Sequence, residues 1–222
     1  NDHAHVTTQN LRLWTQIRLG QHHKIYARMR MQYQDWAAGD ARGFRQHDLE
    51  GPNLEVGYYE LDVTGAAKEA WGWDLGASVR ARGGRQYVEV GRGIALAEYL
   101  DVGWIAVDTR PLRVEAFVGV NIESEDHIDR SMPGFSRSRR TFYGLEATYK
   151  GIPQHRPYVF WVLQRDWSEE KPEDLGQDYR YDSHYYGVGS RGALAARTRY
   201  AVEAIWEFGD APAMGQEKAD EE

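Results

Sequence analysis

Apolar and polar residues alternate with a period of two along most of this chain. The pattern is clearest in 112–121, where apolar residues at even positions oppose a more polar set, Arg113, Glu115, Phe117, Gly119 and Asn121. The runs 11–19, 24–34 and 199–208 repeat it. Because successive side chains of a strand point to opposite faces of its sheet, these runs predict β-strands. Less regular runs predict six further strands at 54–64, 78–92, 103–109, 141–150, 156–166 and 183–192.

Two of these runs do not alternate simply. In 78–92 the apolar residues change parity between Val79 and Val88, so we expect a β-bulge at Gly83-Gly84 that restores the facing. The run 156–166 is apolar on both sides, so its facing stays open.

The connections between the predicted strands differ in length at the two rims of the sheet. Those after even-numbered strands are long and rich in charge, Gly or Pro: 35–53, 93–102, 123–140 and 167–182. Those after odd-numbered strands are mostly short: 20–23, 65–77, 110–111, 151–155 and 193–196, with a helical turn expected at 66–71. Long loops on one rim and short turns on the other are typical of outer-membrane barrels.

The composition is compatible with a membrane barrel. Hydrophobic residues make up 41% of the chain, mean hydropathy is −0.70, and no run approaches the roughly 18 apolar residues of a transmembrane helix. In a transmembrane barrel only every second residue meets lipid, which lowers the average. Because lipid cannot hydrogen-bond the backbone, such a sheet must close. We therefore predict an all-β, antiparallel up-and-down transmembrane β-barrel of about ten strands. It forms one domain over 1–222, with strands in 11–209 and tails at 1–10 and 210–222.

Arginine dominates the cations, with 22 arginines against five lysines. A guanidinium group binds a carboxylate through two parallel hydrogen bonds and keeps its charge, so a series of arginines suits an anionic sugar chain. If the apolar positions face lipid, acids including Glu60, Asp62, Asp108 and Glu207 face inward. We predict a substrate path lined by Arg12, Arg18, Arg28, Arg30, Arg80, Arg82, Glu89, Arg92, Arg113, Glu115, Glu146, Arg165, Arg191, Arg199 and Glu203. The other interpretation is that these charges neutralise one another inside a polar barrel.

Several short segments resemble the alginate-export porin family. They are Val88-Glu89-Val90-Gly91-Arg92-Gly93, the strand Arg113-Val114-Glu115-Ala116-Phe117-Val118-Gly119, and the later segments 141–146 and 200–203. The likeness extends over most of 11–209. Gly93 replaces the family's usual Gln, so no role of that amide in the pore carries over.

This resemblance implies a bacterial outer-membrane channel of about eighteen strands that passes alginate-like anionic polysaccharide, with periplasmic export components as partners. If the long loops are extracellular, a chain of ten strands has both of its ends on the extracellular side. In the family both termini lie on the periplasmic side. We therefore expect a segment of a larger barrel, although a self-contained ten-stranded barrel stays open. The chain begins at Asn1 without an apolar signal segment, which indicates a mature secreted form or a piece of a longer protein.

Other functions find less support in the sequence. The net charge of −7 gives no reason to expect nucleic-acid binding, and the absence of cysteine excludes disulfides and thiolate chemistry. Glu60 and Asp62 share a strand face like an acid/base pair, but no nucleophile accompanies them. We predict no enzyme activity, no cofactor and no metal. The pair His3 and His5 lacks a nearby carboxylate pattern, and His22-His23 is interpreted as a solvated turn.

Three functional hypotheses remain. The first is an outer-membrane channel for anionic poly- or oligosaccharide, in which the basic run 137–140 recruits anions or contacts lipopolysaccharide. The second is a soluble β-barrel that binds a ligand inside, and the third is a non-transporting structural outer-membrane barrel. The surroundings of one sheet face distinguish the membrane hypotheses from the soluble one. This face carries Leu11, Met29, Val118 and Trp206. It contacts lipid in a membrane barrel, and protein or water in a soluble one.

Overall fold

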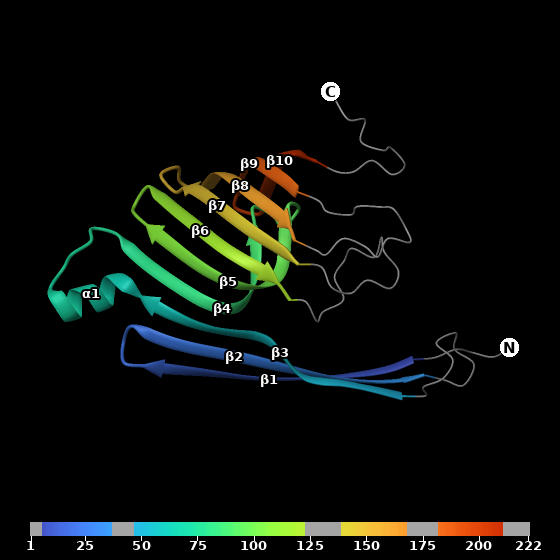
Figure 1. The fold of residues 1–222 in the computed structure, drawn as a ribbon. Coiled ribbons are helices and arrows are strands. Elements are labelled where there is room, and N and C mark those ends of the chain that lie inside the picture. The colour runs from blue at the N-terminus through green and yellow to red at the C-terminus, as the bar shows by residue number, and fades with distance from the viewer. Residues whose placement is uncertain (1–5, 37–46, 123–138, 168–181, 211–222) are drawn as a thin grey trace, which may run out of the picture.

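The computed structural model describes residues 6–36, 47–122, 139–167 and 182–210 (Figure 1). All ten predicted strands are present in these parts of the chain. They are β1 (Val6–Leu19), β2 (His23–Trp36), β3 (His47–Asp62), β4 (Ser78–Val90), β5 (Leu96–Asp108), β6 (Leu112–Asn121), β7 (Arg140–Tyr149), β8 (His155–Asp166), β9 (Asp182–Ala195) and β10 (Thr198–Asp210). One helix, α1 (Val63–Trp71), connects β3 to β4.

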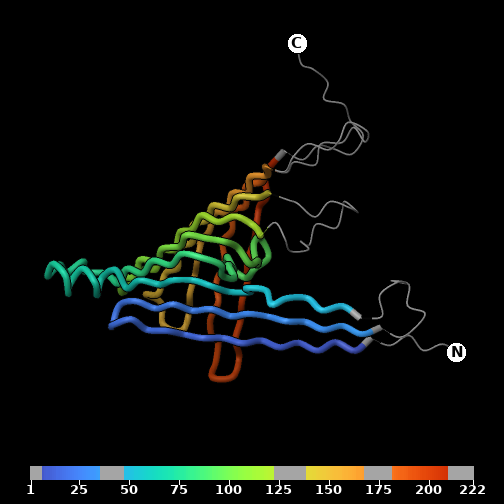
Figure 2. The backbone as a smooth tube through the Cα atoms, turned by 60° about the horizontal axis from the view of Figure 1, so that its bottom comes forward, coloured from blue at the N-terminus to red at the C-terminus, as the bar shows by residue number. Residues whose placement is uncertain are grey.

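The strands form one antiparallel up-and-down sheet in chain order, from β1 to β10. Its two edge strands do not pair with each other, so the described residues form an open sheet. This agrees with the expected segment of a larger barrel and not with a self-contained ten-stranded barrel. β4 to β10 curl strongly, whereas β1 to β3 form a flatter ribbon (Figures 1 and 2). The two parts are joined by a short ladder, in which only Gly57–Asp62 of β3 pair with Arg80–Arg85 of β4.

The β4–β5 hairpin leaves this ladder and bends toward β9 and β10 (Figure 1). The bend occurs at Gly84, whose φ of 124° is accessible mainly to glycine. The predicted bulge at Gly83-Gly84 is wrong, because β4 and β5 pair without any register shift from Ser78 to Val90. The predicted long loop 93–102 is also wrong, since β5 begins at Leu96 and only 91–95 connect the two strands.

Substituting Gly84 by alanine is expected to destabilise the fold by about 1–3 kcal/mol, because its backbone conformation strains any L side chain. A Cβ atom there would also clash with the carbonyl oxygen of Gly57. Gly83→Ala is the matched control, since a Cβ at Gly83 meets nothing within 4 Å. Denaturant titrations of both variants check this. Equal losses in the two would contradict the bend at Gly84.

The remaining connections agree with the predicted asymmetry of the rims. Residues 20–22, 109–111 and 196–197 are tight turns, and the predicted helical turn at 66–71 lies within α1. Asp62 caps this helix by accepting a hydrogen bond from Gly65 N, and Gly72 ends it in the left-handed conformation. Within the described residues, no helix is both long and apolar enough to cross a bilayer. Most of the long connections after β2, β6 and β8 lie outside the described residues.

The apolar core lies inside the curl, between the bent hairpin and the strands opposite it. Val88, Val90, Leu96, Leu100 and Val102 of β4 and β5 pack against Phe142, Tyr158, Phe160 and Val162 of β7 and β8. We call these nine residues the interior cluster. Leu100 and Val162 are fully buried. The space that the sequence predicted to be polar is thus partly filled by protein.

Candidate functional site

Most of the predicted lining residues share one face of the sheet. Directly paired residues of antiparallel strands lie on the same face, and alternate residues of a strand share it. By this register, twelve of the fifteen lie on the concave face of the curl or on its continuation over β1 to β3. They are Arg12, Arg18, Arg28, Arg30, Arg80, Arg82, Arg113, Glu115, Glu146, Arg191, Arg199 and Glu203. Whether they line a substrate path stays a prediction.

Glu89 was assigned to the wrong face. The assignment required a bulge at Gly83-Gly84, which the register does not contain. Without it, Val88 and Val90 turn into the interior cluster, and Glu89 between them is exposed on the opposite face.

Arg165 was also assigned to the wrong face. The run 156–166 gave no clear facing, and the structure places Gln164 and Asp166 inside, both buried. Arg165 therefore lies on the convex face, where its Nη1 atom is 2.6 Å from Asp182 Oδ2. An ion pair at this strand end is compatible with a position beyond the apolar part of the convex face.

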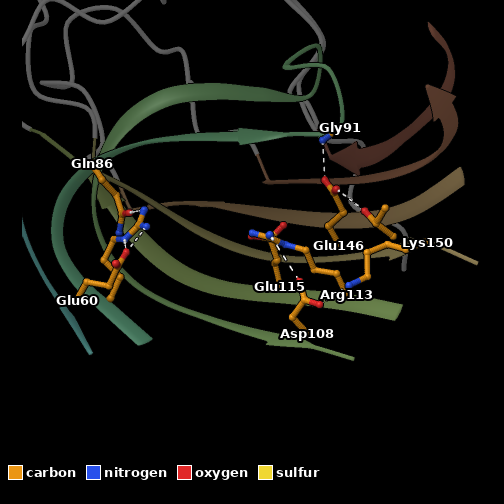
Figure 3. A network of polar contacts seen from close by, with 10 residues as sticks. Glu60, Gln86, Gly91, Asp108, Arg113, Glu115, Glu146 and Lys150 are labelled. Carbon is orange, nitrogen blue, oxygen red and sulfur yellow. Dashed lines mark hydrogen bonds and ion pairs between the residues drawn. The ribbon is translucent and has the colours of Figure 1, made fainter. Parts of the chain in front are cut away.

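Arg92 lies in the connection 91–95, at the tip of the β4–β5 hairpin. Its backbone N–H donates to Glu203 Oε2 at 3.1 Å, and its guanidinium group donates to the carbonyl oxygen of Ala201 at 3.1 Å. The neighbouring Gly91 N–H donates to Glu146 Oε2 at 2.9 Å, as Figure 3 shows. Glu146 and Glu203 thus hold the hairpin tip against β7 and β10.

One ion-pair network surrounds Glu60 of β3. Glu60 is paired with Arg82 and lies 2.6 Å from Lys24 Nζ. The Arg82 guanidinium lies over the rings of Tyr58 and Trp104, 4.6 and 4.8 Å from their centroids, and donates to Gln86. Arg82 is therefore fully engaged by protein groups.

A second network joins β5, β6 and the end of β7 (Figure 3). Arg113 Nη2 lies 2.8 Å from Glu115 Oε1, and Arg113 also approaches Asp108, which pairs with Lys150. Two cations and two carboxylates balance here. This network matches the interpretation that interior charges neutralise one another. The network around Glu60 does not, because it sets two cations, Lys24 and Arg82, against one carboxylate.

A third network contains Glu55, which the sequence analysis did not identify. The register between β2 and β3 shifts at this point, so Glu55 is an extra residue that reaches the same side as Arg28 and Arg12. Its Oε2 atom is 2.7 Å from Arg28 Nε and 3.2 Å from Arg12 Nε. The sequence alone contains no signal for this residue, because Glu55 has the opposite parity to Glu60 in the same strand and was expected on the other face.

Arg28 also donates a hydrogen bond of 3.0 Å to Tyr99 Oη of β5. Tyr99 was missed because it falls in the segment that we predicted to be a loop. Its ring contacts that of Tyr87, with 5.1 Å between the centroids. These contacts place the outer side of the hairpin opposite β2.

Some concave-face arginines make no ion pair with the described residues. They are Arg18, Arg30, Arg80, Arg191 and Arg199. Arg30 donates to Asn10 and Gln32, and Arg191 lies 5.8 Å from the ring centroid of Tyr158. Their charges remain available to a ligand.

The weaker sequence signals have different outcomes. Glu60 is held by cations and Asp62 caps α1, so neither resembles a free acid/base pair. His22 is not simply solvated, since its Nε2 atom lies 2.8 Å from Glu69 Oε2.

In the described parts of the chain, no group of three or more His, Asp or Glu residues is arranged to hold a metal. His3, His5 and residues 137–138 of the basic run lie outside the described residues, whereas Arg140 pairs with Asp166 at 3.2 Å.

The chain was compared with known families and proteins. No family model matches it, and no curated protein matches its sequence.

Proposed function

We propose that this sheet is part of an outer-membrane β-barrel, a channel that passes anionic oligo- or polysaccharide. The observation that carries the proposal is the convex face, which is apolar and exposed on strand after strand. Its exposed residues include Leu11, Ile17, Met29, Tyr59, Ile105, Val118, Leu145, Val159, Val188, Val202, Trp206 and Phe208. Such a continuous apolar surface is rare on a soluble protein.

The charged residues of the convex face support the same placement. Asp35, Arg165 and Asp182 lie at strand ends beside the long connections, where a headgroup region would begin. Arg85, Glu89 and Asp101 lie in the part of β4 and β5 that bends away from β3. Elsewhere on the described convex face the strands present uncharged residues, as a hydrocarbon contact requires.

The free edges of β1 and β10 add a requirement. In hydrocarbon each unpaired backbone N–H or C=O group costs roughly several kcal/mol of free energy. In a membrane both edge strands must therefore pair with other strands. The described residues provide no such strand beyond β1 or β10. A closed barrel therefore needs pairing partners at both of these edges.

The charges of the interior support passage of anions. Arginines without an ion-pair partner among the described residues accompany the networks, and two of those networks have two cations for one carboxylate. A second candidate, a structural barrel without transport, is favoured by the interior cluster, which fills part of the curl.

Solute flux distinguishes these two candidates. The protein in liposomes should admit uronate oligomers faster than neutral oligosaccharides of equal size. Arg80→Gln should lower this preference by up to about five-fold, because an exposed charge contact contributes about 1 kcal/mol or less. Arg165→Gln on the convex face is the matched control and should change nothing. Absence of flux for every solute would reject the channel and support the structural barrel. A monodisperse protein in detergent-free buffer would reject both.

A further inference from the structure

The β4–β5 hairpin crosses the interior and contacts both walls. On one side Gly91 and Arg92 are held by Glu146 of β7 and Glu203 of β10. On the other side Tyr99 accepts a hydrogen bond from Arg28 of β2. The hairpin therefore divides the concave side into two parts.

The two contacts differ in strength. The side toward β7–β10 combines two hydrogen bonds to carboxylates with the interior cluster, and Tyr158 Oη adds a 2.6 Å hydrogen bond to Glu203. Because the residues of this cluster are apolar and buried, they leave no room for a hydrated solute to pass. Among the described residues, the side toward β2 and β3 has no buried apolar cluster and rests on two hydrogen bonds. One runs from Arg28 to Tyr99 Oη, and the other from Arg85 Nη1 to the carbonyl oxygen of Leu54 at 3.2 Å. The Arg28 side chain keeps 28% of its surface exposed.

The charges at the Arg28–Tyr99 contact favour an anion. Arg12 and Arg28 carry two positive charges and Glu55 carries one negative charge, so the group that contains Arg28 has one net positive charge. On the same face of the hairpin, Arg85 pairs with Asp101 and the pair adds no net charge, while Glu89 lies farther along, opposite Ala97. Arg28 uses Nε for Glu55 and Nη2 for Tyr99. A ligand carboxylate can therefore replace the tyrosine hydroxyl without breaking the Arg28–Glu55 ion pair, and it gains a charge-assisted hydrogen bond.

The aromatic residues at this contact fit a sugar ring. Tyr87 packs on Tyr99 and is half-exposed, so its ring offers a flat apolar surface beside the guanidinium group. A pyranose presents apolar C–H groups on its faces and, in a uronate, a carboxylate at its edge. The two side-chain types thus match the two chemical features of a uronate.

We propose that the Arg28–Tyr99 contact is the uronate-binding subsite of this protein, where the sugar carboxylate displaces the Tyr99 hydroxyl from Arg28. Passage then occurs between the hairpin and β1–β3, and not through the interior cluster. The inference rests on the proposed function and specifies where selectivity arises. Tyr99 is a positioning residue that occupies Arg28 until the anion arrives.

Single-cysteine labelling tests the subsite without measuring transport. The chain contains no cysteine, so Tyr99→Cys introduces the only thiol. In liposomes an anionic methanethiosulfonate should modify Cys at position 99 at least about five-fold faster than a cationic one, since one net positive charge lies nearby. A uronate trimer should protect this thiol, whereas a neutral trisaccharide should not. Adding Arg28→Gln should remove the protection.

Leu75→Cys is the matched control, because Leu75 is exposed in the connection from α1 to β4, away from the hairpin tip. It should be labelled and never protected. Tyr99→Phe keeps the ring and should bind the trimer about five-fold more tightly, because one competing hydrogen bond is removed. Equal labelling rates without protection, or unchanged binding by Tyr99→Phe, would overturn the subsite. Loss of flux in the unmodified protein would instead reject the proposed function, whatever the thiol reports.

Discussion

Placing arginine at position 118 is expected to destabilise the protein in a bilayer by about 2–4 kcal/mol. Val118 lies on the convex face of β6, with 48% of its surface exposed, opposite Gly103 of β5 and Tyr143 of β7. If this face meets hydrocarbon, the guanidinium group loses its hydration without gaining a partner. If the face meets water, an arginine on an exposed strand position should change stability by only about 0.5 kcal/mol.

The measurement is a denaturant titration of the protein folded into phospholipid vesicles. Val118→Leu keeps the position apolar and should leave stability almost unchanged. Val120→Arg lies two residues nearer the strand end and should cost about 1 kcal/mol or less, because the penalty falls with distance from the bilayer midplane. A graded loss from 118 to 120 supports lipid contact. An equal and small effect at both positions would show that the convex face is solvated.

The alternation of apolar and polar residues predicts a strand and its facing wherever one face of the sheet is apolar and the other is charged. In β6, the face of Val118 and Val120 is exposed and that of Arg113 and Glu115 carries an ion-pair network. A one-residue slip would exchange the two, so the sequence specifies the register strongly. For the same reason, twelve of the fifteen predicted residues lie on the expected face.

Alternation could not distinguish an apolar face that meets lipid from one that packs inside. Val88 and Val90 alternate correctly for a strand, but their face is the interior and not the outside. The bulge that we predicted assumed that every apolar residue faces outward. The direction of the β4–β5 hairpin depends on contacts with Glu146 and Glu203, which lie far away in the chain. No local pattern contains that information.

Glu55 and Tyr99 illustrate a second limit of the sequence. The face of Glu55 depends on one extra residue in β3 relative to β2, which appears only when the two strands are paired. Tyr99 belongs to a strand whose inner residues, Leu96 and Leu100, pack in the interior cluster. Its position opposite Arg28 follows from the bend at Gly84, a single residue whose φ the sequence does not reveal.

The interior cluster and the Arg28 side therefore have separate roles in the molecule. The cluster fixes the hairpin to β7–β10, so variants there should change stability and hairpin position. The Arg28 contact lies on the other side of the hairpin and is partly exposed, so variants there should change ligand binding with little effect on stability. Unfolding titrations of the cluster variants and ligand-binding measurements on the Arg28 variants can verify this division.

Phe160→Ala is expected to have the largest effect on stability within the cluster, a loss of about 3–5 kcal/mol. The Phe160 ring is 5% exposed and lies close to the backbone of Gly187 and of Gly91 at the hairpin tip, where an added Cβ would contact it. Removing the ring leaves a cavity beneath the hairpin. The hydrogen bonds from Gly91 and Arg92 to Glu146 and Glu203 then lose their apolar cover and become accessible to water.

Hydrogen exchange tests this mechanism beside the unfolding titration. In Phe160→Ala the amides of Gly91 and Arg92 should exchange faster, while those of β1 and β2 should not change. Val159→Ala is the matched control, because Val159 is the next residue on the convex face and should cost about 1 kcal/mol or less. If both variants lose the same small amount of stability, or if exchange at the hairpin tip is unaltered, the cluster does not hold the hairpin. The division of the interior would then fail as well, because it depends on that attachment.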